Sequence, residues 1–77
     1  MMTLSELPKG VQAQIAHIEF GQQEDTALLE MGLLPGTEVS LAYRSPLGDP
    51  IVVRLGQDNY QLSLRKSDAA RIEVKMA

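Results

Sequence analysis

The sequence contains no cysteine, no tryptophan and only one histidine among its 77 residues. Without cysteine, the chain can form neither a disulfide nor a thiolate metal site, and this composition fits a reducing compartment. A single histidine, His17, is too small a supply for a Ser-His-Asp or Cys-His arrangement. A strand position explains His17 better than a ligand role, because a metal ligand needs convergent partners. We therefore expect no catalytic residues, no cofactor and no transition-metal site.

Long apolar runs and an excess of positive charge are also missing. No stretch of about 18 apolar residues occurs, so no transmembrane helix is expected. The first residues have neither a basic n-region nor a long apolar h-region, which argues against a signal peptide and favours the cytoplasm. Seven Lys and Arg against ten Asp and Glu give a net charge of −3, which disfavours nucleic-acid binding. The carboxylates fall at expected caps, turns and outward strand positions, and a weak oxygen-ligand site for a hard cation stays open.

The chain does contain a series of short apolar runs separated by Gly and Pro. Their alternation of apolar and polar residues is typical of β-strands that are buried on one face. In the first run the alternation changes phase after Ile15, which predicts either a β-bulge or a strand that passes around a barrel corner. In the second run, Val39, Leu41 and Tyr43 are expected to face the core. The pattern predicts five strands, at residues 11–19, 38–44, 51–55, 60–64 and 72–76.

Three short helical segments are expected between these strands. Thr3 and Glu6 have the spacing of a capping box, which predicts a helical turn at the start of the chain. Residues 22–31 contain good helix formers and predict a short helix. Residues 67–70 predict a single helical turn, for which Ser67 is the expected N-cap.

Five short strands cannot bury both of their faces as a flat sheet. Curling into a small barrel encloses the aliphatic faces and removes most exposed edges. The predicted fold class is therefore mostly β: a small SH3-like β-barrel of five strands. A short helix is inserted after the first strand and a one-turn helix before the last. The length predicts one domain over residues 1–77.

Two connecting segments are more specific in composition than a connection requires. In residues 29–39, Gly and Pro have a structural explanation as a helix end and a turn. In residues 45–51, Pro46 and Pro50 lower the entropy of the free loop, which pre-organises it for contact. Leu47 lies at the tip of this loop and has no obvious place in a core. Core packing and partner contact are both open for Leu47.

Three stretches together resemble the FeoA family. They are LLEMGLLPGTEVSL at residues 28–41, SPLGDPIVVRL at residues 45–55 and YQLSLRKSDAARIEV at residues 60–74. The opening TLSELPKG also matches the usual start of that family, so the resemblance covers essentially the whole chain. The combination of Met-Gly-Leu-x-Pro-Gly with Pro-Leu-Gly-Asp-Pro is its specific part.

This resemblance implies an SH3-like barrel that serves as a small cytoplasmic accessory of bacterial ferrous iron uptake. The implied partner is FeoB, the membrane permease with a cytoplasmic G-protein region, and contact with the membrane would come only through this partner. The alternative is a metal- or ligand-responsive regulatory domain that resembles the C-terminal domain of DtxR-type iron-dependent repressors. Family members often carry several basic residues just before the Leu-Leu pair, whereas residues 22–27 here read QQEDTA. A charge-based contact of that helix must therefore differ in sign or location.

The motif matches also yield an expected partner-binding surface, made of the rigid loop, the exposed helix face and the Leu-Arg-Lys stretch. We expect a non-enzymatic regulator that uses this surface, and exposed strand edges leave a homo-oligomer open. The expected contact residues are Leu28, Met31, Leu33, Pro46, Leu47, Gly48, Asp49, Arg65 and Lys66.

Overall fold

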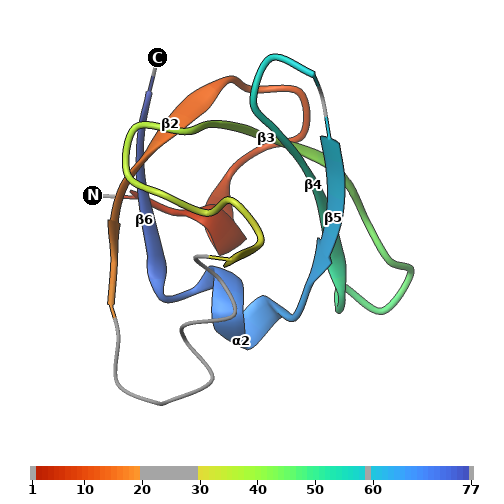
Figure 1. The fold of residues 1–77 in the computed structure, drawn as a ribbon. Helices are drawn as coiled ribbons and strands as arrows, with labels where there is room; N and C mark the ends of the chain where they lie inside the picture. Colours follow the sequence, from red (N-terminus) through yellow and green to blue (C-terminus); the bar gives the residue numbers. More distant parts are fainter. Residues whose placement is uncertain (1, 20–29, 59, 77) are drawn as a thin grey trace.

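The computed structural model describes residues 2–19, 30–58 and 60–76, and its fold is mostly β (Figure 1). The predicted fold class is thus confirmed. The expected helix over residues 22–31, including Leu28, lies almost entirely outside the described residues; of that range the structure describes only residues 30 and 31. The described elements are β1 (Met2–Thr3), η1 (Leu4–Glu6), β2 (Ala13–Ile18), β3 (Glu38–Arg44), β4 (Ile51–Leu55), β5 (Tyr60–Leu64), α2 (Lys66–Ala69) and β6 (Ile72–Met76).

All six strands belong to one antiparallel sheet in the order β1-β6-β2-β3-β4-β5. The expected number of five strands was wrong because β1 has only two residues, too few to produce an alternating pattern. The sheet curls around its apolar face but does not close, since β1 and β5 lie at opposite ends of the strand order. The barrel is therefore open, with β1 and β5 as its edges.

Two bulges adjust which side chains face the core. The pairing of β2 with β6 shifts register between Ile15 and His17, which confirms the first of the two explanations of the phase change, a bulge. A second shift, between Leu41 and Tyr43 in β3, was not predicted. It turns Tyr43 outward, so that this side chain is 50% exposed. The expectation that Tyr43 faces the core was therefore wrong.

The core is aliphatic and lies inside the curled sheet. Leu4 of η1 and Leu7, which follows it, are both fully buried. Leu33 enters the same core from the connection before β3. The sheet contributes the remaining large side chains, among them Ile15, Ile18, Val39, Leu41, Ile51, Val53, Leu64, Ile72 and Val74.

The helices are short. Within residues 2–19, 30–58 and 60–76, none is long and apolar enough to cross a lipid bilayer.

The capping box at the start of the chain is formed as predicted. The Glu6 carboxylate accepts hydrogen bonds from the Thr3 backbone N–H at 2.9 Å and from the Thr3 hydroxyl at 3.1 Å. The backbone hydrogen bond, followed by the hydroxyl, lowers the pKa of Glu6 from its ordinary value of 4.5, because both stabilise the ionised form. These bonds fix the turn that places Leu4 in the core.

Replacing Glu6 by Gln should lower the melting temperature at neutral pH. Since the pKa of Glu6 is lower in the folded state, its contribution is present above the unfolded value and is lost as pH falls through the folded value. The difference between wild type and Glu6→Gln should therefore shrink below pH 4.5. Thermal unfolding, followed by circular dichroism at neutral pH and below pH 4.5, measures this difference in melting temperature. Glu19→Gln, which removes the same charge from another exposed residue, is the control. A pH-independent difference between the Glu6 variant and wild type would contradict the assignment.

Candidate protein-interaction surface

The loop between β3 and β4, residues 45–50, is tightly folded. Within it, the Gly48 N–H donates to the Ser45 carbonyl at 2.7 Å, and the Ser45 N–H donates to the Pro50 carbonyl at 3.1 Å. Ser at the first position of such a turn, Pro at the second and Gly at the fourth are the residues that a type I turn prefers. Gly48 has a φ of +84°, which favours glycine. We name residues 45–50 the Leu47 loop.

Leu47, at the tip of this loop, is 95% exposed. Leaving a leucine in water forgoes about 1.5–3 kcal/mol that its burial would contribute. No other large hydrophobic side chain in the described part of the chain is as exposed. Pro46, its neighbour, is exposed as well. The structure therefore gives Leu47 no core role, and the residue stays available to a partner.

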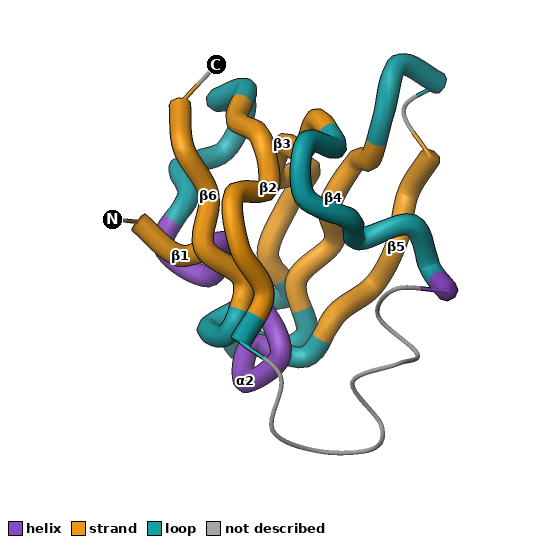
Figure 2. Tube along the Cα trace, turned by 60° about the vertical axis from the view of Figure 1, so that its left-hand side comes forward, coloured by secondary structure: helices purple, strands orange, loops and turns teal. Residues whose placement is uncertain are grey.

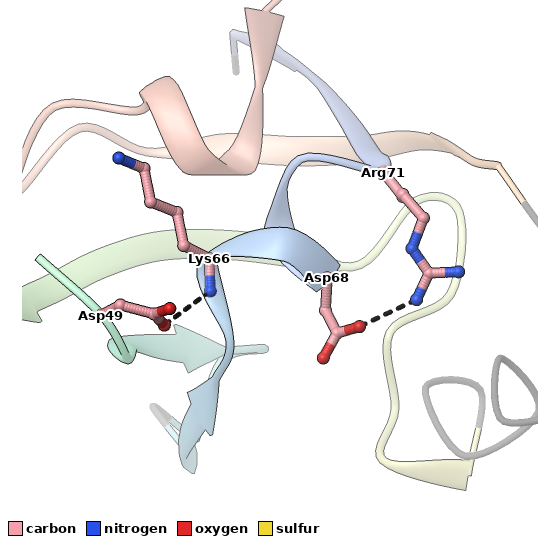
Figure 3. A network of polar contacts seen from close by, with 4 residues as sticks. All are labelled: Asp49, Lys66, Asp68 and Arg71. Atoms are coloured by element: carbon pink, nitrogen blue, oxygen red, sulfur yellow. Dashed lines mark hydrogen bonds and ion pairs between the residues drawn. The ribbon is translucent and has the colours of Figure 1, made fainter.

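Asp49 connects the Leu47 loop to α2. Its Oδ1 atom accepts a hydrogen bond from the Lys66 backbone N–H at 2.9 Å (Figure 3). Lys66 is the first residue of α2, so this carboxylate occupies an N–H that the helix itself leaves without a partner. Ser67 was the expected N-cap, but the cap position is Arg65, whose side chain makes no capping hydrogen bond. The carboxylate that accepts the hydrogen bond from the helix N-terminus is that of Asp49, 17 residues earlier in the chain.

Cationic side chains surround the base of the Leu47 loop. Arg44 is paired with Ile51, and Ile51 with Leu64, so these three strands end at the same level. Arg44, before the loop, and Arg65, after Leu64, are both exposed, as is Lys66. The Arg44 guanidinium donates to the Leu7 carbonyl at 3.1 Å, which holds it against the segment after η1. The loop thus combines an apolar tip with a basic surround.

At the other end of α2, the helix residue Asp68 forms an ion pair with Arg71, which follows the helix. Arg71 donates to Asp68 at 2.8 Å, with both side chains about a third exposed (Figure 3). An ion pair this accessible to water contributes little to stability. The exposed cations that border the Leu47 loop are therefore Arg65, the N-cap residue of α2, and Lys66, its first residue.

The Met-Gly-Leu-x-Pro-Gly motif at residues 31–36, in contrast, has a structural role. Residues 34–37 form a turn in which the Thr37 N–H donates to the Leu34 carbonyl at 3.0 Å, and Gly36 has the positive φ of +91° that a type II turn requires. Two further bonds fasten this turn to β2: Gly36 N–H to the Ile15 carbonyl at 2.7 Å and Ile15 N–H to the Thr37 carbonyl at 2.9 Å. The motif therefore closes part of the barrel.

The expectation that Leu33 contacts a partner was wrong. Its side chain is fully buried among core residues, because the turn fastened to β2 directs it inward and leaves Leu34 47% exposed. The adjacent Met31 is 42% exposed. Leu28 lies outside the described residues.

The structure thus gathers six of the nine expected contact residues in one place, the Leu47 loop with the start of α2. Met31 belongs to the separate segment that precedes the turn on β2. Sequence reasoning missed Tyr43, which the β3 bulge turns outward next to Arg44, and Tyr60, which is 60% exposed. Tyr43 had been expected to face the core because it continues an apolar alternation. Among the described residues, no three His, Cys, Asp or Glu side chains lie close enough together to hold a metal ion.

Replacing Asp49 by Ala should destabilise the protein by about 1 kcal/mol, the usual effect of losing a helix cap. Asp49→Asn should retain most of the stability, since an amide oxygen also accepts the Lys66 N–H. Urea unfolding measures both. Asp58→Ala, at an exposed turn residue, controls for the loss of negative charge. An Asp49→Ala protein as stable as wild type would rule out a capping contribution.

Known proteins resemble this chain over nearly its whole length. A family model described as the FeoA domain matches residues 2–76. A Porphyromonas gingivalis (strain ATCC BAA-308 / W83) protein described as an Fe(2+) transport protein A/Fe(2+) transporter FeoB fusion protein is 40% identical over 75 residues. That match covers 97% of this chain but only 9% of the relative.

Solved structures with the same fold are also similar in sequence. Iron(II) transport protein A from Clostridium thermocellum is 41% identical with a TM-score of 0.90, covering 99% of this chain and 46% of that chain. FeoA from Stenotrophomonas maltophilia in complex with zinc, described as a prokaryotic SH3 domain protein, is 33% identical with a TM-score of 0.80. The match covers 97% of this chain and 91% of that one. The predicted SH3-like fold is thereby confirmed.

Because the family model spans nearly the whole chain and the relatives share both its fold and a third or more of its sequence, this chain belongs to the FeoA family, which is associated with ferrous iron transport.

Proposed function

We propose that this protein is a non-enzymatic accessory of ferrous iron uptake that binds the cytoplasmic G-protein region of the permease FeoB. The contact is made by the Leu47 loop together with Arg65 and Lys66, and the protein acts on the cytoplasmic side of the membrane. The observation that carries the proposal is the 95% exposure of Leu47 on a loop whose shape is fixed by hydrogen bonds.

The rigidity of the Leu47 loop supports a binding role. Two backbone hydrogen bonds within the loop and the bond from Lys66 to Asp49 hold it in one shape before any partner arrives. A pre-organised loop loses little conformational entropy on binding, so more of the contact energy contributes to affinity. An apolar tip with a polar surround is also the usual composition of an interface centre and its rim.

A relative supports the choice of partner. In the Porphyromonas gingivalis protein, a part 40% identical to this chain is described as fused to the transporter FeoB. Joining two binding partners in one chain raises their effective concentration toward each other. In the present case the same partnership would form between separate or linked chains through the surface described above.

The mechanism proposed is a shift of conformational equilibrium. A protein that binds one state of the permease better than another stabilises that state by the difference in binding free energy. No bond to substrate is required from this chain, and its contribution is the contact surface alone.

Substituting Leu47 by Asp tests the proposal directly. Because the side chain is exposed, the variant should fold like wild type, while affinity for purified full-length FeoB should fall at least about tenfold. Binding is measured by interferometry with immobilised FeoB, with and without guanine nucleotide. Gln57→Asp, which adds the same charge at an exposed turn residue, should bind normally. Unchanged affinity of a folded Leu47→Asp protein would remove the loop from the interface.

A second candidate is a metal- or ligand-responsive regulatory domain like the C-terminal domain of DtxR-type repressors. The observation that favours it is the zinc complex of the Stenotrophomonas maltophilia relative. Calorimetry of the isolated chain with ferrous iron and with guanine nucleotides separates the two. Dissociation constants on the order of micromolar for the chain alone would favour the second candidate.

A further inference from the structure

Among the described strands, β5 is an edge of the sheet, with no strand paired on the side away from β4. It comes last in the strand order, so that β4 is its neighbour among the described strands (Figure 2). The opposite edge, β1, has only two residues, whereas β5 has five. An edge of this length presents a row of backbone N–H and C=O groups that can pair with a further strand.

The composition of β5 lacks the features that usually protect such an edge. Its five residues, Tyr60–Leu64, include no charged residue and no proline, although charges and prolines are the common means of blocking edge-to-edge pairing. Tyr60 is 60% exposed, and Leu62 is only partly buried against the core. The edge thus offers apolar surface together with its backbone groups.

We propose that β5 pairs antiparallel with β5 of a second copy of this chain, centred on Leu62, to form a symmetric dimer. In this register Tyr60 lies opposite Leu64 of the second copy, and Gln61 lies opposite Ser63. The pairing is self-complementary: aromatic side chains meet aliphatic ones, and polar ones meet polar ones. It continues the sheet from one molecule into the next and covers Leu62 on both sides.

Charge complementarity selects a second copy over an unrelated strand. Asp58 lies four positions before Leu62 and Lys66 four positions after it, with Arg65 beside Lys66. Antiparallel pairing about Leu62 therefore brings the acidic end of each copy toward the basic end of the other, twice in one dimer. All three side chains belong to exposed residues, and the Lys66 side chain extends away from Asp49 (Figure 3).

The proposed interface is small, so the dimer must be measured over a wide range of protein concentration. One five-residue strand on each side buries less surface than a stable complex needs, so the dimer is weak and concentration-dependent. Sedimentation equilibrium of the chain from about ten micromolar to about one millimolar covers the range expected for such a contact. Raising the salt concentration should shift the equilibrium toward monomer, because the end pairs are exposed.

Two matched double variants test the register. Gln61→Glu with Ser63→Glu places like charges opposite each other across the dimer, whereas Gln61→Glu with Ser63→Lys places opposite charges there. In both variants the Glu at position 61 lies beside Arg54 of the same molecule, since Arg54 pairs with Gln61. The first variant should dimerise about tenfold more weakly than wild type, and the second at least as strongly as wild type. Circular dichroism verifies that both fold.

Several outcomes overturn the proposal. One is a wild-type chain that stays monomeric up to about one millimolar. Another is an equal shift in both double variants, and a third is a dimer in which amide exchange protection is gained outside β5. These measurements use the isolated chain, so they succeed or fail independently of binding to FeoB.

Discussion

Burial of an aliphatic core without any covalent support is the constraint on which this structure depends. A chain of 77 residues without cysteine has no disulfide to stabilise it, and a domain this small buries only about 60% of the surface of its unfolded chain. A curled sheet is an efficient solution, because one continuous face encloses the core from several sides. Leu4, Leu7 and Leu33 fill the space that six short strands leave open.

In the candidate site, one hydrogen bond likewise serves two parts of the structure. The Leu47 loop contributes no large side chain to the core, yet it is ordered by hydrogen bonds that are also needed elsewhere. Asp49 occupies the first N–H of α2, and α2 in turn places Ala69 in the core. A single carboxylate therefore stabilises the helix and positions the loop, so that the exposed Leu47 is presented at little additional conformational cost.

The sequence predicted those features that depend on neighbouring residues. The bulge in β2 was visible because polar residues flank the change of phase at Ile15. The bulge in β3 was not, because Tyr43, unlike His17 at the corresponding place in β2, is aromatic and continues the apolar alternation even though it turns outward. The capping box was likewise predictable from Thr3 and Glu6, which are three residues apart and bond to each other.

Features that depend on distant contacts were less accessible. Leu33 and Leu34 have the same side chain, and only the hydrogen bonds of the following turn to β2 decide which of them is buried. The family resemblance identified the Leu47 loop and the Leu-Arg-Lys stretch as separate motifs. Their connection through Asp49 spans 17 residues and has no local signal. The site was thus predicted residue by residue, whereas its assembly required the structure.

The pairing of β1 with β6 has a consequence for how this fold can be joined to other proteins. Met2 lies opposite Val74, so the first and last described strands are direct neighbours in the sheet. The start of β1 and the end of β6 therefore lie side by side, and a linker of a few residues would connect them in a circular permutant. A fusion partner attached at either end would leave from the same side of the barrel, and the orientation of the Leu47 loop toward that partner would change little with the choice of end.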